Sequence, residues 1–219
     1  MQKGEIKIDS EKYPSLLAKT KNPPRRLRYR GAFDENIFQS TLAVVGSRKA
    51  TGYGRVVTEK LVQELAKEGT TIVSGFMYGI DALAHRAALS VGGRTIAVMP
   101  CGVDVIHPEY QKSLFYEIEK KGLILSEFED DFPPDKWTYP KRNRIVVGLS
   151  VATLVIEAAE RSGSLISASF AKDYGRAVFA VPGEITSGVS RGTNKLIKKG
   201  AKIVTCAEDI SYFFREKNK

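Results

Sequence analysis

From Thr41 onward, short runs of aliphatic and β-branched residues alternate with longer stretches of helical periodicity. The predicted strands are residues 42–45, 71–73, 95–99, 123–125, 153–156, 177–181 and 202–204. Predicted helices cover residues 55–68, 80–91, 108–121, 164–174 and 193–199, each followed by a glycine, and a further helix begins near Pro140. Strand–helix–strand units this short form parallel strands joined by right-handed crossovers. The chain is therefore predicted to be an α/β protein with a doubly wound, mostly parallel sheet and helices on both faces.

The segment before this alternation, residues 1–40, is predicted to be a basic, proline-containing lead-in to a main domain at residues 41–219. The chain holds 34 Lys and Arg against 25 Asp and Glu, a formal net charge of +9. Residues 1–31 contain nine of the cations and three of the acids, which places +6 of that charge in the lead-in. Tyr13-Pro14 and Pro23-Pro24 disfavour a helix and indicate extended backbone. This charge suits a polyanionic partner, but a solvated arm explains it equally well.

A short acidic stretch stands apart from these basic surroundings. Glu127, Glu129, Asp130 and Asp131 run into Pro133-Pro134, which predicts an exposed loop. Such a loop either shields a binding face or only keeps itself hydrated, and the sequence leaves both alternatives open.

Composition argues against a membrane protein and against most enzymes. The longest apolar runs are far too short to span a bilayer, and the first residues lack the apolar core of a secretion signal. Cys101 and Cys206 are isolated, which fits a reducing cytoplasm better than a disulfide scaffold. Cys101, Asp104 and His107 match neither a zinc pattern nor a nucleophile motif, and two histidines leave little acid–base machinery. We expect a cytoplasmic protein without catalytic residues, metal or other cofactor, and not an enzyme.

In a doubly wound sheet, ligands bind beyond the carboxyl ends of the strands. Gly46-Ser47-Arg48 follows the 42–45 strand and precedes a helix, so it offers backbone N–H groups and a guanidinium to a phosphate. The spacing is not the GxGxxG of dinucleotide sites, and no acid closes the next strand. These features predict phosphate recognition without dinucleotide binding, although a surface ion pair is the commoner role of an arginine such as Arg48.

The loop after the 71–73 strand combines glycines with two aromatic residues. Phe76 and Tyr78 either stack on bases, as in single-strand binders, or pack beneath the loop. Asp81 is expected to cap the following helix through its side chain. His85 lies one turn later among alanines and is expected to pack within the fold.

The strongest local signal is the run Tyr-Pro-Lys-Arg-Asn-Arg-Ile at residues 139–145. On a helix that begins near Pro140, Lys141 and Arg144 share one face and Arg142 points elsewhere. One cation is then free to bind phosphate while another anchors the loop to the fold. Asn143 is expected to bridge backbone groups.

A second helix start follows the 153–156 strand. Ser162, Gly163 and Ser164 can cap this helix and present N–H groups to an anion. Glu157 at the strand end resembles a catalytic carboxylate, but we favour a buried ion pair with Arg161 or Arg144.

Seven segments, in this order, resemble the DprA (also called Smf) family of bacterial DNA-processing proteins. They are Gly46-Ser47-Arg48 and residues 74–89 (SGFMYGIDALAHRAAL), 92–98 (GGRTIAV), 139–150 (YPKRNRIVVGLS), 162–171 (SGSLISASFA), 175–183 (GRAVFAVPG) and 190–201 (SRGTNKLIKKGA). The resemblance extends over nearly the whole chain, the lead-in from Tyr13 included. It implies an extended Rossmann-like domain that binds single-stranded DNA, forms a homodimer and helps to load the RecA recombinase onto incoming DNA during natural transformation.

The resemblance also implies roles for individual positions. Arg48 matches the arginine that lines the family's DNA groove, and Lys141 or Arg142 matches its second basic contact. The predicted DNA-binding set is Ser47, Arg48, Gly75, Phe76, Lys141, Arg142, Asn143, Gly163, Ser164 and Ser167. The family pairs through the terminal part of the fold, which predicts a dimer interface of Leu196, Ile197, Ile210, Tyr212 and Phe213, with Leu196 and Ile197 alternatively plain core. No winged-helix domain is evident after Asp209.

Two other functions in the same superfamily stay open at this point. Nucleotide-handling enzymes such as the phosphoribohydrolases carry a motif similar to PGGxGTxxE after a strand. The residues around Glu157 and Ser162 in this chain are arranged differently, which argues against such an enzyme. A sensor that binds a small nucleotide in the same groove is the other alternative.

Overall fold

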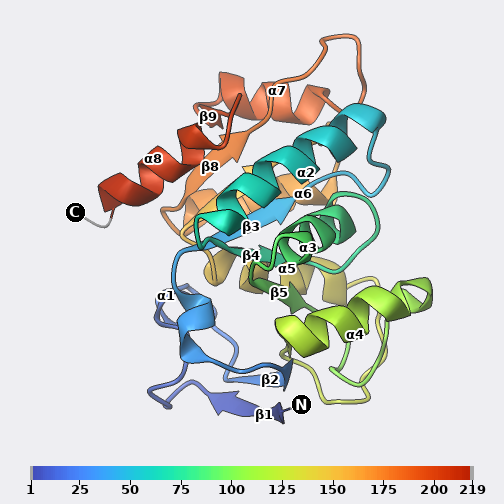
Figure 1. Cartoon of the computed structure of the whole chain (residues 1–219), viewed down its shortest axis with the longest axis vertical. Helices are drawn as coiled ribbons and strands as arrows, with labels where there is room; N and C mark the ends of the chain where they lie inside the picture. Colours follow the sequence, from blue (N-terminus) through green and yellow to red (C-terminus); the bar gives the residue numbers. More distant parts are fainter. Residues whose placement is uncertain (1, 218–219) are drawn as a thin grey trace.

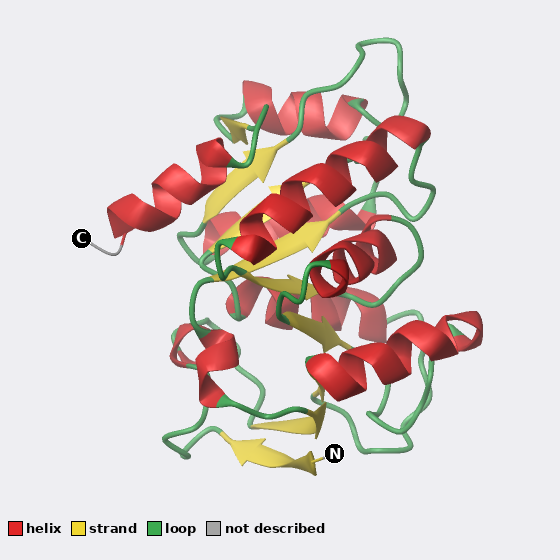
Figure 2. Cartoon of the chain, in the orientation of Figure 1, coloured by secondary structure: helices red, strands yellow, loops and turns green. Residues whose placement is uncertain are grey.

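Runs of aliphatic residues form the buried centre of a nine-stranded sheet in the computed structural model, which describes residues 2–217 (Figures 1 and 2). The strands are β1 (Gln2–Lys7), β2 (Arg26–Gly31), β3 (Thr41–Val45), β4 (Thr71–Ser74), β5 (Thr95–Val98), β6 (Leu123–Ser126), β7 (Ala152–Val155), β8 (Ala177–Ala180) and β9 (Lys202–Ile203). Their order across the sheet is β1-β2-β6-β5-β4-β3-β7-β8-β9. Strands β3 to β9 pair in parallel, which confirms the predicted α/β architecture.

Helices lie on both faces of this sheet. They are α1 (Ser15–Ala18), α2 (Gly52–Lys67), α3 (Ile80–Ser90), α4 (Lys112–Lys121), α5 (Thr138–Gly148), α6 (Gly163–Asp173), α7 (Arg191–Lys198) and α8 (Glu208–Lys217), with 3-10 turns η1 (Glu35–Phe38) and η2 (Glu109–Gln111). Figure 1 shows α2, α3 and α4 in front of the sheet and α5 and α6 behind it. No helix within residues 2–217 is long and apolar enough to cross a membrane.

Successive side chains of β3 pack alternately into two hydrophobic clusters, one on each face of the sheet. Leu42 and Val44 pack into a cluster with α2, α3 and α8, whereas Ala43 and Val45 pack into a second cluster with α1, α5 and α6. Successive side chains of a strand point to opposite faces, so a strand covered on both faces is apolar throughout. The strand ends are thereby fixed between two helical layers.

The lead-in is more structured than the sequence predicted. Strands β1 and β2 pair antiparallel with each other, and β2 pairs antiparallel with β6, so the lead-in adds two strands to the same sheet. Helix α1 packs its buried Leu17 against α5, where a Cβ on Gly148 would lie 2.5 Å from Leu17 Cδ1. The prolines disfavour a long helix but allow this short one.

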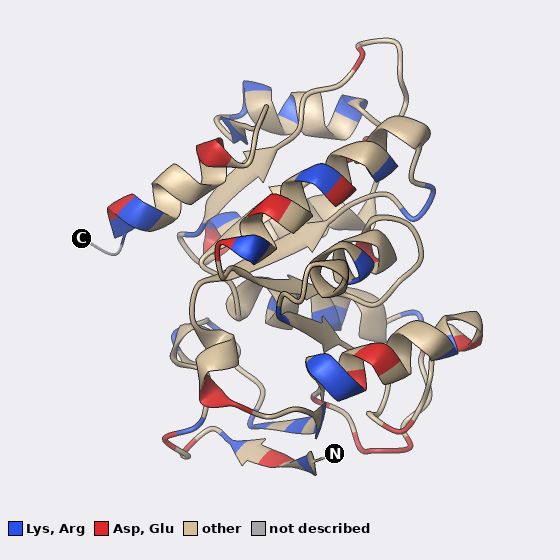
Figure 3. Cartoon of the chain, viewed as in Figure 1, with Lys and Arg blue, Asp and Glu red and all other residues tan. Residues whose placement is uncertain are grey.

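Carboxylates of the main body neutralise much of the basic lead-in. Arg26 and Arg28 both bind Glu129, and Lys3 Nζ lies 2.6 Å from Asp104 and 2.8 Å from Asp130. Figure 3 shows the acidic loop beside the basic strands at this end of the molecule. The loop whose role the sequence left open therefore pairs with the chain's own cations.

Candidate nucleic-acid interface

The loops at the carboxyl ends of the parallel strands enclose a groove of about 650 Å³. It is lined by Val45, Gly46, Ser47, Arg48, Lys49, Met77, Asp81, Lys136, Tyr139, Pro140, Arg142, Asn143, Ala159, Ser162, Gly163, Ser164, Ile166, Ser167 and Val189. Seven of the ten residues in the predicted DNA-binding set line this groove, and Gly75, Phe76 and Lys141 do not. Contact of the ten residues with DNA stays a prediction, but the fold brings seven of them together at one site.

Arg48 reaches the groove without a carboxylate partner among the described residues. Its guanidinium carbon lies 5.1 Å from the ring centre of Tyr139 and 5.8 Å from that of Tyr78. The surface ion pair that is the commoner fate of an arginine is thus not formed here. Aromatic faces attract a cation while leaving its N–H groups free to donate. Arg48 is therefore an exposed, oriented cation with its hydrogen-bonding capacity unused.

The interpretation of Phe76 as a base-stacking residue is wrong. Its ring is fully buried and packs edge-on against Phe115, with the ring centres 6.0 Å apart. The backbone of Phe76 has a φ of 56°, which turns the side chain inward. Flanking glycines made the loop look open in the sequence, whereas its first aromatic residue belongs to the core.

Arg142 serves as an internal anchor. It is only 2% exposed, and its Nη1 donates to the carbonyl oxygen of Val98 at 3.0 Å. Burial lowers the pKa of Arg142 to about 10, although the carboxylate of Asp81 opposes that change. Gly75 makes room for this guanidinium, because an added Cβ would lie 1.7 Å from Nη1. Gly75 thus has a packing role that the sequence did not reveal.

Asp81 does not cap α3 as expected. The N-cap is Gly79, with no side-chain capping bond, and the Asp81 carboxylate accepts weakly from the backbone N–H of Met77 at 3.4 Å. Burial raises the pKa of Asp81, and the charge of Arg142 opposes that rise. The buried His85 confirms its predicted packing role, with Nδ1 2.7 Å from Thr95 Oγ1.

Lys141 and Arg144 share a helix face, as predicted. Both approach Glu127, at 3.4 Å and 2.5 Å respectively, and Arg144 also donates to the carbonyl oxygen of Asn22. The Lys141 side chain is 42% exposed, and its Nζ lies 5.3 Å from the ring centre of Trp137. Arg142 and Arg144 are held by the fold, so Lys141 is the accessible cation of this segment.

The start of α6 forms the opposite wall of the groove. Ser162 is its N-cap, and the Ser162 hydroxyl accepts from the backbone N–H of Ser164 at 3.3 Å. Asn143 Nδ2 lies 3.5 Å from the Gly163 carbonyl oxygen, which ties α5 to this helix start. Free N–H groups at a helix N-terminus favour an anion. Ser167 is almost completely buried and lines the floor.

The predicted ion pair of Glu157 with Arg161 or Arg144 is not formed. Glu157 instead accepts from the backbone N–H and the hydroxyl of Thr51, at 3.1 Å and 2.5 Å. Thr51 caps α2 through the same hydroxyl, so the carboxylate fixes the helix start rather than a cation. Two groove residues that the sequence did not single out as contacts are Lys49 and Tyr139. Lys49 follows the end of β3, and Tyr139 is the first residue of the run at 139–145 that the sequence marked as its strongest local signal.

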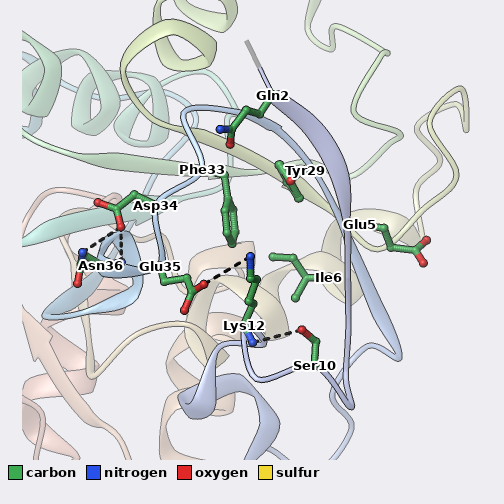
Figure 4. A pocket seen from close by; sticks show the side chains of 10 residues that line it. All are labelled: Gln2, Glu5, Ile6, Ser10, Lys12, Tyr29, Phe33, Asp34, Glu35 and Asn36. Atoms are coloured by element: carbon green, nitrogen blue, oxygen red, sulfur yellow. Dashed lines mark hydrogen bonds and ion pairs between the residues drawn. The ribbon is translucent and has the colours of Figure 1, made fainter.

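A second large hollow, of about 780 Å³, lies beside the lead-in strands (Figure 4). Glu5, Asp34 and Glu35 line it, while its cation Lys12 pairs with Glu35 at 3.8 Å. Carboxylates of this density repel phosphate. The groove at the strand ends is therefore the better candidate for binding a polyanion.

The predicted dimer residues divide into buried and exposed members. Ile210 is fully buried in the core of its own chain, so it cannot form an interface as proposed. Leu196 packs partly against the second core cluster, and Ile197 is half-buried. Tyr212 is 61% exposed, and the half-buried Phe213 lies beside it on α8 with Lys202 Nζ 4.5 Å from its ring centre. Tyr212 is the most exposed member of the set, while Phe213 packs partly on the core of its own chain through Phe179.

Comparison with known proteins identifies relatives across almost the whole chain. Residues 5–215 match the family model described as DNA recombination-mediator protein A. Protein Smf of Synechocystis sp. is 42% identical over 199 residues, which are 90% of this chain and 50% of that protein. The chain thus spans about half the length of this relative.

Two solved structures share the fold closely. DNA processing protein A from Streptococcus pneumoniae is 41% identical with a TM-score of 0.92, and the match covers 97% of this chain and 74% of that one. DNA processing protein A from Helicobacter pylori is 34% identical with a TM-score of 0.88, covering 99% and 97%. The latter structure concerns the unique mode in which that protein binds single-stranded DNA.

Proposed function

The chain belongs to the DNA recombination-mediator protein A family, and on that premise we propose that it binds single-stranded DNA in the groove at the strand ends. The observation that carries the proposal is Arg48, whose exposed guanidinium lies over two aromatic rings and has no carboxylate partner within residues 2–217. The N–H groups at the start of α6 line the same groove, and the exposed Lys141 lies next to Arg142 and Pro140, which line it. Phosphates bound there would be neutralised by groups that the fold already holds in place.

Removal of the Arg48 charge tests this proposal. We expect Arg48→Ala to weaken binding of a fluorescent oligothymidine at least tenfold, and to lower the salt dependence by roughly 0.7 log units per log of salt. Anisotropy at two salt concentrations measures both quantities. Arg94→Ala is the control, because Arg94 is a half-buried arginine just ahead of β5 at the opposite edge of the sheet, and among the described residues its side chain bonds only the Gly69 carbonyl oxygen.

Two results would count against the groove. Equal affinity for duplex and single-stranded oligonucleotides is one, because stacking and backbone tracking should favour the single strand. An Arg48→Ala variant that binds as tightly as the Arg94→Ala control is the other. Trp137, the single tryptophan, lies beside Lys141, so its fluorescence offers a second readout of binding.

We further propose that the protein acts by binding and not by catalysis. Its reactive side chains are poorly disposed for chemistry: burial lowers the pKa of His85 to about 3 and raises the pKa of Cys101 to about 12. His107 is occupied by the hydroxyl of Tyr139, with Nε2 and the phenol oxygen 2.8 Å apart. Release of base from nucleoside monophosphates would instead favour the enzyme alternative, and tight binding of a mononucleotide would favour the sensor.

The family also supports finer proposals about partners and place. We propose a homodimer through Tyr212 and Phe213, and a role in loading RecA onto incoming single strands in the cytoplasm during natural transformation. The exposed aromatic face on α8 and the two unpaired cysteines are consistent with these proposals. Light scattering that shows only monomer at micromolar concentration would contradict the dimer. A RecA filament-assembly assay on single-stranded DNA tests the loading step.

A further inference from the structure

A smaller cleft opens on the other side of Arg48, outside the groove. Its volume is about 200 Å³, and it lies between α2, α3 and η2. The residues that line it are Arg55, Tyr78, Gly79, Ala82, Leu83, Arg86, Tyr110 and Gln111. Two aromatic rings and two arginines thus meet in a space suited to one flat ring rather than to a folded ligand.

The two tyrosines expose their rings although both could pack. Tyr78 is 41% and Tyr110 69% exposed, with ring centres 6.1 Å apart and planes inclined by 34°. Gln111 is almost fully buried, and its Nε2 donates to the carbonyl oxygen of Phe76 at 3.1 Å. This bond joins the loop that carries Tyr78 to the turn that carries Tyr110. The rings are therefore positioned before any ligand arrives, which reduces the entropic cost of stacking.

The two arginines that line the cleft are unpaired within the described part of the chain. Arg55 on α2 and Arg86 on α3 are exposed, and within residues 2–217 neither side chain forms an ion pair or hydrogen bond. This differs from the lead-in, where Arg26, Arg28 and Arg30 all bind carboxylates. Positive charge that the fold leaves uncompensated beside exposed aromatic rings matches the chemistry of single-stranded nucleic acid.

Arg48 connects this cleft to the groove. Its guanidinium lies between Tyr139, which lines the groove, and Tyr78, which lines the cleft. The two loops also touch through the backbone, since Ile80 N–H donates to the Ser47 carbonyl oxygen at 3.1 Å. A Cβ on Gly79 would lie 2.2 Å from that oxygen, so only glycine permits this approach. Arg48 therefore lies where a bound strand would pass from the groove into the cleft.

We propose that the cleft is an additional nucleotide subsite, in which one base of the same single strand stacks on Tyr78 and Tyr110 while Arg55 and Arg86 bind the neighbouring phosphates. The inference rests on the proposed function of the groove and extends its path. Stacking uses the faces of a base, so the subsite accepts any base. A duplex keeps those faces covered, which adds to the preference for single strands.

A length series of oligothymidines tests the subsite. Oligonucleotides that only fill the groove bind wild type and Tyr110→Ala equally, whereas longer ones bind the variant on the order of tenfold more weakly. Tyr78→Ala also weakens the longer oligonucleotides, and because Tyr78 contacts Arg48 it weakens the shorter ones to some extent as well, which makes Tyr110→Ala the cleaner variant. Tyr116→Ala is the matched control, because Tyr116 is an exposed tyrosine on α4 outside both sites and should leave every length unaffected. Arg55→Ala with Arg86→Ala lowers the salt slope for long oligonucleotides by about 1.4.

A measurement on the unaltered protein complements the variants. An oligonucleotide that carries 5-iodouracil, irradiated in the complex, forms a covalent bond to an aromatic side chain on which the base stacks. Cross-links at Tyr78 or Tyr110 support the subsite. Cross-links only elsewhere, or Tyr110→Ala and Tyr78→Ala variants that bind long oligonucleotides like wild type, overturn it. Failure of the groove itself is recognised separately, because Arg48→Ala would then leave even the shortest oligonucleotides bound.

Discussion

Gly75 offers a sharp test of how the groove is built. A Cβ at this position would lie 1.7 Å from Arg142 Nη1 and 2.4 Å from Arg142 Cζ. The Gly75 backbone is not in the left-handed region, so a substitution acts through this contact alone. Arg142 cannot move away cheaply, because its guanidinium is buried and bonded to the Val98 carbonyl oxygen.

The expected cost of Gly75→Ala follows from these contacts. A hydrogen bond to a charged group contributes about 1.5–3 kcal/mol, and overpacking a core costs about 1–3 kcal/mol. Since the displaced guanidinium relieves part of the overpacking, we expect the free energy of unfolding to fall by about 2–4 kcal/mol. Urea denaturation followed by circular dichroism measures it. If Gly75 instead served close approach of DNA, stability would be unchanged and only affinity would fall.

A double-mutant cycle separates the clash from other effects. Methionine at position 142 lacks the guanidinium, so Gly75→Ala should cost at least about 1 kcal/mol less in an Arg142→Met background than in wild type. Equal costs in the two backgrounds would refute the steric argument. A cost below about 0.5 kcal/mol in wild type would do the same, since that is the range of ordinary surface substitutions.

Two further predictions concern stability. Leu17→Ala should lower the free energy of unfolding by about 2–5 kcal/mol, because Leu17 fills the contact between α1 and α5. Leu16→Ala, at a half-buried neighbour, is the control. Equal urea midpoints for the two variants would show that Leu17 does not pack α1 onto the main domain. Burial lowers the pKa of His85 to about 3, so between pH 6.5 and 3 the unfolded chain binds a proton that the folded chain does not. Acid therefore lowers the free energy of unfolding in this range, by up to about 1.4 kcal/mol per pH unit. His85→Gln should reduce the difference in the free energy of unfolding between pH 7 and pH 5, measured by urea titration. An unchanged difference would exclude His85 as its source.

The central sheet and the position of the site could be predicted from the sequence. Strands such as Leu42–Val45 are apolar on both faces, and glycines end the helices between them, so local signals and the global fold agree. Topology then places everything that follows a strand at one edge. Arg48, Asn143 and Ser164 meet at the groove for that reason alone.

The lead-in strands could not be predicted in the same way. Strand β2 reads Arg-Leu-Arg-Tyr-Arg-Gly, and its cations find partners such as Glu119 and Glu129 about 90 to 100 residues away. Strands at an edge are stabilised by cross-strand and long-range pairs rather than by their own hydrophobic pattern. A single sequence does not reveal which distant carboxylates the fold will bring next to these arginines.

Side-chain direction was the other obstacle. Phe76 and Tyr78 are two residues apart in one loop, yet the first is core and the second is exposed. Phe76 has a positive φ, and its ring packs against Phe115, a contact made by a residue far along the chain. Likewise, the sequence showed that Arg142 differs in direction from Lys141, but not that burial makes it the anchor.

The internal pairing of the lead-in has a consequence for how the molecule appears to a distant polyanion. Nucleic acid gains affinity when protein cations release the counterions condensed on its phosphates. Arg26, Arg28 and Lys3 already form ion pairs with carboxylates of their own chain. A phosphate would have to displace those carboxylates before it could bind. Beyond a Debye length of about 8 Å at physiological salt, that end of the molecule presents little net field. Arg48, Arg55 and Arg86 form no ion pair within residues 2–217, so their charge remains available to attract an approaching strand toward the strand ends.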